Sequence, residues 1–472
     1  MIGSVARPGG LRLVVWRAGI RPRGRSRELG LLVMLAGTLA VGQLSLASTR
    51  AGRLDAGDVA PLGAYLLGLF VCHFVFVSCG RRMDQVLLPV VGLLGGISLL
   101  FMERLPQGLV SQSLAGTRLG LEQLQLLWLL LGTAVLGLTA VLVRRDGWLR
   151  YYRYTWAIAG IALLLLVFVF GEEVNGARLS LRIGPLQGQP SELLKVILVI
   201  FLAAYLADNR PLLARSSMHL GRLPLPPLTY LLPMLAMWGL ALGVVIVQKD
   251  LGAALLFYSV FLAMLYAATR RPSFVLLGVV LFVVGAVVLY ATVPHVRIRV
   301  DIWLDPFADA LGAGYQVIRG LYALGSGGLL GTGLAAGLPQ VGSVPAIPLL
   351  HTDFVFAGLA EELGLVGGVA LCGVYLIIAE RGLRIAARAA DDFHALLATG
   401  LTLVIVIQAA LIMAGNLRLV PLTGITLPFV SYGGSSLLTN ALVVGLLLAL
   451  SDRGVDRVLP APTRPAILRE SC

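Results

Sequence analysis

Long apolar stretches alternate with short polar ones along the whole of this 472-residue chain. A helix that spans a bilayer needs about 20 consecutive, mostly apolar residues, and stretches of about that length recur from one end of the chain to the other. The pattern therefore predicts an all-α polytopic membrane protein with about twelve spanning helices. Their predicted bounds are 29–48, 61–79, 86–102, 125–143, 154–170, 191–207, 228–248, 251–268, 274–293, 353–379, 394–414 and 435–451.

Composition agrees with this class of protein. Hydrophobic residues make up 58% of the chain and charged residues 13%, with a mean hydropathy of +0.90, whereas a soluble domain carries about twice that charged fraction. No polar stretch is long enough to fold as a separate soluble domain. Three of the four cysteines, Cys72, Cys79 and Cys372, lie in apolar stretches, and Cys472 is the last residue. Neither a disulfide framework nor a metal site is indicated.

The basic residues predict the orientation in the plasma membrane. The net charge of +13 does not indicate a nucleic-acid-binding protein, because the arginines gather in short segments between apolar stretches. Seven of them precede the first span, and the segments on that side of the membrane hold 25 of the 37 Lys and Arg residues. Cytoplasmic segments are enriched in these residues, so both termini are predicted to be cytoplasmic. The first apolar stretch has the length of a retained anchor rather than of a cleaved signal peptide.

Two of the segments predicted to lie outside are unusual. Residues 171–190 are polar and amphipathic, and residues 294–352 form a long loop, a type of segment that is commonly functional. Within this loop, 314–337 is too apolar for a solvated linker. It is predicted to lie on the outer leaflet or to enter it as a re-entrant segment.

Four polar clusters lie at the predicted outer ends of spans, where an ionisable side chain is a candidate functional residue. In the first, Pro190 suits the first turn of a helix, and Glu192 and Lys195 share one helix face because they are three residues apart. The pair could neutralise itself inside the bundle. Alternatively, Lys195 could bind an anionic substrate while Glu192 orients it.

Two further clusters allow both a structural and a functional interpretation. Residues 248–252 form a sharp polar break between two spans, either as a plain tight turn or as part of a site. His351, Thr352 and Asp353 open the span that follows the long loop. Asp and Thr are favoured helix N-caps, but the position of Asp353 after a glycine-rich region also suits a reaction chamber.

The fourth cluster, 421–436, carries two prolines and several glycines at the entrance to the last span. This composition indicates either irregular backbone that lines a cavity or a seam of small residues between helices. No Walker loop, dinucleotide-binding fingerprint, His/Cys metal spacing or G-x-S-x-G elbow occurs in a context that would support it.

These clusters, in this order, resemble the SEDS family of cell-wall polymerases, which includes RodA, FtsW and SpoVE. Two features differ from the usual family pattern: the first two spans are additional to a ten-helix core, and Lys249 replaces a proline. Within the family, the chain is most similar to actinobacterial RodA-like proteins. The motifs that carry the resemblance are NGAR (175–178), QPSELLK (189–195), QKDLGAALL (248–256), LDPFAD (304–309), GYQ (314–316), LGSGGLLGTGL (324–334), HTDFVFAGLAEELG (351–364) and PLTGITLPFVSYGGSS (421–436).

The resemblance implies a peptidoglycan glycosyltransferase that polymerises lipid II at the outer face of the membrane, in elongation or division. It also implies a class B penicillin-binding protein as partner, alongside other elongation or division machinery. The essential acid of the family falls on Asp353, and Glu192 and Lys195 match a family pair near the substrate cavity. The other residues predicted to bind substrate are Asn175, Arg178, His351, Thr352, Ser431, Tyr432 and Ser435.

The resemblance also implies three regions: 1–83, a cytoplasmic tail with two additional helices; 84–452, the catalytic core; and 453–472, a cytoplasmic tail. No cofactor is assigned with certainty, although a divalent cation could offset charge on the leaving diphosphate, as Lys195 or Arg178 could.

The implied reaction needs a base, and the pKa of Asp353 is subject to two opposing effects. A helix N-terminus lowers the pKa of a carboxyl group, whereas burial raises it, and burial is expected to dominate. A flippase for a lipid-linked precursor is the alternative function, and a scaffold without activity is a third. The absence of a visible inverted repeat and the outer position of the clusters favour the enzyme.

Overall fold

The structure is a computed structural model, and its helices account for most of the chain. Ten of them are long and apolar enough to cross a membrane, within the residues that the structure describes. These residues are 25–50, 56–110, 112–114, 117–143, 147–174, 177–183, 186–213, 218–220, 223–225, 239, 243, 250–337, 340–341 and 344–454.

The helices confirm the all-α class and most of the predicted spans. Eleven of the twelve predicted spans coincide with a helix, although the apolar part of α6, Arg153–Val167, is shorter than the other ten. The predicted span 228–248 lies almost entirely outside the described residues. The helices are α1 (Ser26–Arg50), α2 (Ala56–Ser78), α3 (Leu87–Arg104), α4 (Leu121–Leu142), α5 (Gly147–Tyr151), α6 (Arg153–Phe170), α7 (Pro190–Leu213), α9 (Leu251–Thr269), α10 (Pro272–Thr292), α11 (Pro294–Leu304), α12 (Tyr315–Gly327), α13 (Val355–Ala387), α14 (Asp392–Asn416) and α15 (Gly434–Gly454).

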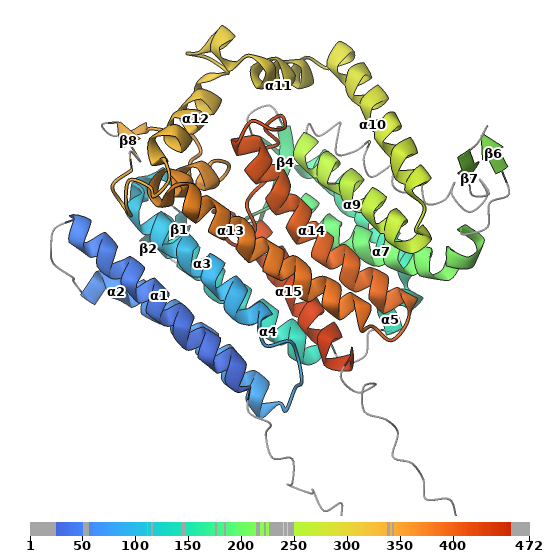
Figure 1. The fold of residues 1–472 in the computed structure, drawn as a ribbon, viewed down its shortest axis with the longest axis horizontal. Coiled ribbons are helices and arrows are strands. Elements are labelled where there is room, and N and C mark those ends of the chain that lie inside the picture. The colour runs from blue at the N-terminus through green and yellow to red at the C-terminus, as the bar shows by residue number, and fades with distance from the viewer. Residues whose placement is uncertain are drawn as a thin grey trace, which may run out of the picture.

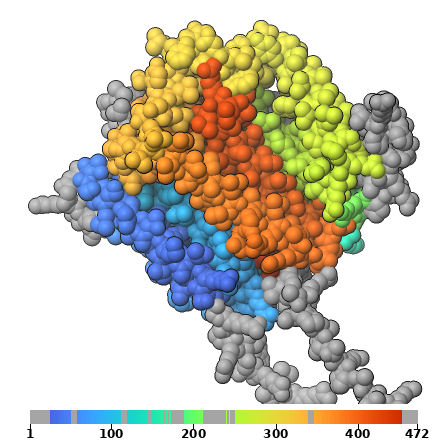
Figure 2. All heavy atoms as spheres, viewed as in Figure 1, coloured from blue at the N-terminus to red at the C-terminus, as the bar shows by residue number. Residues whose placement is uncertain are grey.

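Helix α14 occupies the middle of the bundle, where it packs against α7, α9, α13 and α15 (Figure 1). The two additional helices, α1 and α2, lie at one edge against α3, and α10 lies against α9 at the opposite edge. Figure 2 shows α13 and α14 side by side across one face of the molecule, between these two edges. Burial follows this arrangement, since 83% of the span in α3 is buried but only 11% of the span in α10.

Short antiparallel strands lie in the connections between helices. The strands are β1 (Gln112–Leu114), β2 (Thr117–Leu119), β3 (Glu172–Val174), β4 (Ala177–Ile183), β5 (Leu186–Gly188), β6 (Met218–Leu220), β7 (Leu223–Leu225), β8 (Gln340–Val341) and β9 (Val344–Pro345). The polar segment 171–190 forms the largest of these units, a three-stranded sheet in the order β3-β4-β5 in which Leu181 pairs with Gly188. Pairing within the sheet satisfies backbone groups that a polar, non-helical segment would otherwise leave open.

The long loop 294–352 contains two helices, α11 and α12, and the short 3-10 helix η2 (Pro306–Asp309). Figure 1 shows these elements across one end of the bundle. The apolar face of α12 packs against α13, with Val317 and Ile318 buried and Gly320 in contact with the Phe354 ring. The segment 314–337 is therefore folded against the bundle and is not a solvated linker.

Helix α13 contains a break at Gly364, whose φ is 68°. Here α13 exchanges backbone hydrogen bonds with the segment that follows α12. The amide of Leu365 donates to the Gly328 carbonyl (2.9 Å), and the amide of Thr332 donates to the Glu361 carbonyl (3.0 Å). Such an exchange satisfies groups that the break would leave unpaired in an apolar environment.

Gly364→Ala is expected to lower the thermal stability of the purified protein. With a ψ of −169°, Gly364 lies in a backbone region that is nearly restricted to glycine, where another residue costs about 1–3 kcal/mol. The new Cβ would also lie 2.3 Å from the Gly331 amide nitrogen. Gly373→Ala is the control, because a Cβ at Gly373 on the same helix meets no atom within 4 Å. Melting of both variants in detergent tests the prediction, and equal melting temperatures would contradict it.

Candidate active site

Asp353 lies in the turn that leads into α13, half-buried at the end of the bundle that α11 and α12 cover. Its backbone is fixed by Asn416, the last residue of α14. The Asn416 Nδ2 donates to the Asp353 carbonyl (2.9 Å), and its Oδ1 accepts from the Ala357 amide (3.2 Å). The N-cap of α13 is Phe354, which makes no side-chain cap. The Asp353 carboxylate is therefore not the cap of this helix.

The segment 421–436 binds the other side of the same turn. The Ser431 hydroxyl donates to the Thr352 carbonyl (2.5 Å) and accepts from the Leu427 amide (2.9 Å). The Tyr432 amide donates to the His351 carbonyl (2.8 Å), and the two side-chain rings lie 6.0 Å apart. These bonds tie the turn to the entrance of α15.

Arg299 of α11 lies on the open side of Asp353. Its Nη1 donates to the carbonyl of Thr423 (3.2 Å). A Cβ at Gly424 would lie 3.8 Å from the Asp353 Oδ2 and 3.9 Å from the Arg299 Nη2. The carboxylate and the guanidinium therefore face the same small space beside Gly424, whose φ of 71° favours glycine.

The pKa of Asp353 is raised to about 6, chiefly by burial. Hydrogen bonding with Thr352 and the charge of Arg299 partly offset this effect. The upward direction agrees with the expectation that burial dominates the pKa of Asp353. A carboxyl group with a pKa near 6 is largely ionised at neutral pH and can still accept a proton readily.

A second polar cluster lies at the start of α7. Lys195 is 2% exposed, and its Nζ lies 2.5 Å from the Glu192 Oε2 and donates to the Gln408 Oε1 (2.6 Å). The Gln408 Nε2 in turn donates to the Thr426 carbonyl (2.8 Å). The cluster thus joins α7, α14 and the segment 421–436.

The two clusters are adjacent, because the cavity beside Lys195 also reaches Gly424. This cavity has a volume of about 30 Å³, which is room for one or two water-sized groups. Asp250 lies in its wall, where it caps α9 by accepting from the Ala253 amide (3.0 Å). Burial raises the pKa of Asp250, and the charge of Arg299 acts on both Asp250 and Asp353. The cavity is lined by Gln189, Ser191, Glu192, Lys195, Asp250, Ala253, Leu256, Phe257, Gln408, Gly424, Ile425 and Thr426.

Within the described part of the chain, no group of three or more His, Cys, Asp or Glu side chains is placed to hold a metal ion. Lys195 and Arg299 are cationic side chains at the site.

Known proteins are similar to this chain in sequence and fold. The peptidoglycan glycosyltransferase RodA of Mycobacterium tuberculosis is 38% identical over 449 residues, which cover 94% of this chain and 93% of that protein. A chain of the solved structure described as "Structural coordination of polymerization and crosslinking by a peptidoglycan synthase complex" is 29% identical, with a TM-score of 0.64 over 79% of this chain and 98% of that chain. The rod shape determining protein RodA of Thermus thermophilus is 28% identical, with a TM-score of 0.53 over 79% of this chain and 97% of that one.

The family described as "Cell cycle protein", whose model groups FtsW, RodA and SpoVE, matches residues 82–454. The chain belongs to this FtsW/RodA/SpoVE family. Membership confirms the resemblance that the motifs indicate. It also accounts for the multi-pass membrane architecture, since the solved relatives cover most of the helical bundle. The two helices α1 and α2 precede the matched residues.

The structure of this family member brings most of the predicted site residues into the two adjacent clusters. His351, Thr352, Ser431 and Tyr432 surround Asp353, while the Ser435 hydroxyl accepts from the Gln189 amide (3.0 Å) beside Glu192 and Lys195. Arg178 lies in β4, opposite Glu173 of β3. Asn175 lies outside the described residues, as do Gln248 and Lys249.

Three polar residues of the site were not predicted from the sequence: Arg299, Gln408 and Asn416. A signal existed for Gln408 and Asn416, since each is an amide in or next to the otherwise apolar stretch 394–414, and such side chains often bind across helices. Arg299 carries no comparable signal, because only the packing of α11 over the bundle brings it to Asp353.

Lys195→Met is expected to destabilise the protein, because it leaves the partly buried Glu192 carboxylate without its cation. Removing one partner of a buried ion pair lowers the stability by about 3–5 kcal/mol, because it leaves an uncompensated charge. Removing both charges lowers the stability less. The double variant Glu192→Gln/Lys195→Met should therefore recover most of the melting temperature that Lys195→Met loses. Melting in detergent measures both variants. A double variant as unstable as the single one would show that charge neutralisation is not the structural role of the pair.

Proposed function

We propose that this chain is a peptidoglycan glycosyltransferase that polymerises lipid II at the outer face of the plasma membrane, in cell elongation or division. The observation that carries the proposal is the Asp353 carboxylate, which has a raised pKa and shares a small space with the Arg299 guanidinium. The names of the M. tuberculosis relative and of the solved peptidoglycan synthase complex support this reaction class.

The proposed step joins two lipid-linked disaccharides. Asp353 accepts the proton of the 4-hydroxyl group of one sugar, and the oxygen of that hydroxyl forms a bond to the anomeric carbon of the other. The bond from this carbon to the diphosphate breaks, and its electron pair leaves with undecaprenyl diphosphate. The diphosphate is a good leaving group, so a single base and cationic stabilisation suffice. No covalent enzyme intermediate is required.

The cations of the site suit the charge that the step creates. Negative charge grows on the diphosphate as the bond breaks, and fixed cations in a poorly solvated site stabilise it strongly. Arg299 faces the space beside Asp353, and Lys195 lies at the adjoining cavity, where Glu192 and Gln408 hold it. Arg299 is the cation nearest the base, and Lys195 orients the neighbouring part of the substrate.

The charge distribution supports the proposed outer placement of the reaction. Arg25 beside α1, Arg81 after α2 and Asp452 of α15 are joined by hydrogen bonds at one end of the bundle. The described arginines of two arginine-rich segments, Arg82 and the group Arg381, Arg384 and Arg388, also lie at this end, which the positive-inside rule assigns to the cytoplasm. Asp353 lies at the other end of α13 from these segments.

A transpeptidase is the proposed partner. The similar chain of the peptidoglycan synthase complex comes from a structure that describes polymerisation together with crosslinking. A class B penicillin-binding protein would crosslink the strands that this chain produces. Polymerisation of lipid II should therefore be measured with the protein alone and with such a partner.

Asp353→Asn is expected to lower the rate of lipid II polymerisation by about 10²–10⁴, because an amide cannot accept the hydroxyl proton. The assay follows labelled lipid II with the purified protein and resolves the glycan strands by length. Membrane insertion and the melting temperature should stay close to those of the wild type.

Asp301→Asn is the matched control for this variant. Asp301 is an exposed acid in α11, on the same outer segment as Arg299, and it binds the Tyr290 hydroxyl (3.0 Å). The Asp301→Asn variant should polymerise lipid II at the wild-type rate. Glycan strands of normal length and rate from Asp353→Asn would remove Asp353 from the mechanism.

The polymerisation rate should rise as pH increases through about 6, because the base form of Asp353 is the active form. Arg299 lowers the pKa of Asp353, so Arg299→Gln should move the midpoint of this rise to higher pH. Arg297→Gln, an exposed variant on the same helix, should leave the midpoint unchanged. A pH profile of initial rates measures all three proteins. An unchanged or lower midpoint for Arg299→Gln would contradict the proposed electrostatics.

A further inference from the structure

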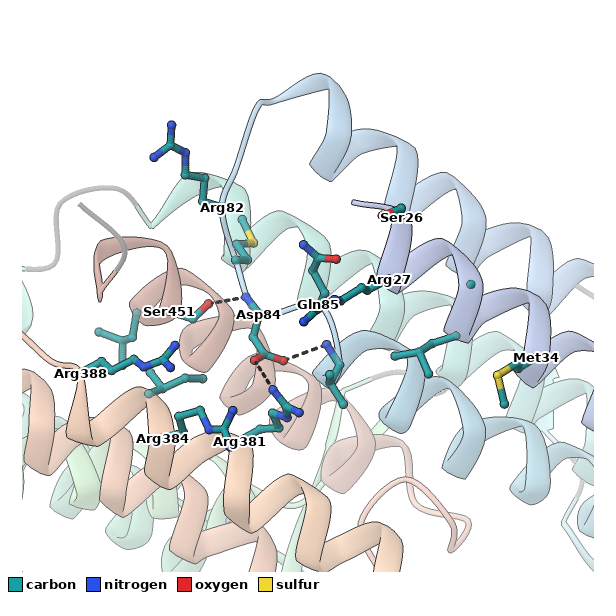
Figure 3. Close-up of a pocket in the computed structure, with 16 residues that line it drawn as sticks. Ser26, Arg27, Met34, Arg82, Asp84, Gln85, Arg381, Arg384, Arg388 and Ser451 are labelled. Atoms are coloured by element: carbon teal, nitrogen blue, oxygen red, sulfur yellow. Dashed lines mark hydrogen bonds and ion pairs between the residues drawn. The ribbon is translucent and has the colours of Figure 1, made fainter. Parts of the chain in front are cut away.

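A cavity with a charged lining lies at the opposite end of α13 from Asp353. It has a volume of about 790 Å³ and lies between the start of α1, the segment 82–86, the end of α13 and the end of α15. Figure 3 shows Arg381 and Arg384 of α13, and Arg388 directly after it, along one side of Asp84, which belongs to the segment 82–86. One wall of the cavity, α1, precedes the part of the chain that matches the family.

The lining of this cavity is strongly cationic. Asp84 is the only acid among its lining residues, and it is already engaged, since its Oδ1 accepts from the Val86 amide (2.8 Å). Glu380, just outside the lining, pairs with two of the arginines. With Glu380 included, the cations exceed the anions by three. The cationic lining residues are Arg27, Arg82, Arg381, Arg384 and Arg388.

On each of the two helices that line the cavity, helix periodicity places the arginines and the apolar lining residues on one face. On α13, residues 381, 384, 385 and 388 share one face, and on α1, residues 27, 30, 31 and 34 do so. The face of α1 therefore carries a cation at the end of the helix and small or apolar side chains in the direction of the bilayer, whereas on the facing end of α13 Ile385 lies among the arginines. This combination suits an amphiphile with an anionic end.

The apolar wall on α1 is open. Met34 is 70% exposed, and Val33 beside it is 57% exposed. A Cβ at Gly30 would meet no atom within 4 Å, so the helix surface there has room for a hydrocarbon chain. A water-soluble anion would use the arginines but not this strip.

We propose that this pocket binds an anionic phospholipid of the cytoplasmic leaflet. The phosphate of the headgroup lies among the arginines, and an acyl chain lies along the strip of α1 from Gly30 to Met34. Basic pockets between membrane helices on the cytoplasmic side recognise such headgroups. The additional helix α1 thus supplies one wall of a lipid site that is separate from the glycosyltransferase site.

The test measures lipid retention by native mass spectrometry. The full-length protein, purified and delipidated in detergent, is titrated with dioleoylphosphatidylglycerol and, separately, with dioleoylphosphatidylcholine. The wild type should bind one phosphatidylglycerol molecule at least tenfold more tightly than phosphatidylcholine. The variant Arg27→Gln/Arg82→Gln/Arg388→Gln should bind phosphatidylglycerol about 100-fold more weakly, given the contribution of each basic residue near a membrane.

Two further variants separate the pocket from general effects of charge and folding. Arg270→Gln removes an exposed arginine at the end of α9, on the same side of the bundle, and should leave the affinity unchanged. Gly30→Leu fills the apolar wall without changing any charge and should weaken phosphatidylglycerol binding at least tenfold. If the triple variant fails to fold, Gly30→Leu alone decides the question.

Competitors identify the occupant. Glycerol 3-phosphate at a hundredfold excess should not displace the lipid, and an acidic peptide of ten glutamates should not bind more tightly than the lipid. Displacement by glycerol phosphate, tighter binding of the peptide, or equal phosphatidylglycerol retention by the wild type and Gly30→Leu would each overturn the proposal.

Discussion

Lys195 is almost completely removed from solvent, and a buried ammonium group must find partners wherever the chain places it. Glu192 balances its charge, and the Gln408 Oε1 accepts a hydrogen bond from it, while the Gln408 Nε2 donates to the Thr426 carbonyl. These bonds hold together three parts of the bundle that are distant in sequence: α7, α14 and the segment 421–436. The same alignment brings Gly424 next to Asp353, so the charge balance at Lys195 and the position of the proposed base depend on one network.

The spans were predictable because hydropathy reflects the one constraint that every membrane helix shares. The bounds of α3 and α14 follow their apolar stretches closely. The break at Gly364 was not predictable, because it depends on backbone hydrogen bonds with a segment about 35 residues earlier. The sheet at 172–188 was missed for a similar reason, since the sequence indicates polarity there but not strand pairing.

The site was predictable where chemistry and position coincided. Asp353, Glu192 and Lys195 are ionisable groups at membrane depth, and the structure places them around adjacent spaces. The hydroxyl of Ser431 binds backbone in the structure, and its role toward substrate stays a prediction. Arg299 could not be assigned from its sequence context, because its importance comes from the packing of α11 across the end of the bundle.

The central claim is that the chain forms glycosidic bonds between lipid II molecules and does not merely move them. Its most direct test places the purified protein, alone and with a class B penicillin-binding protein, in vesicles that carry labelled lipid II. The account predicts glycan strands that a muramidase degrades, together with released undecaprenyl diphosphate. Translocation of lipid II between leaflets without any polymer, in the presence of the partner, would contradict it.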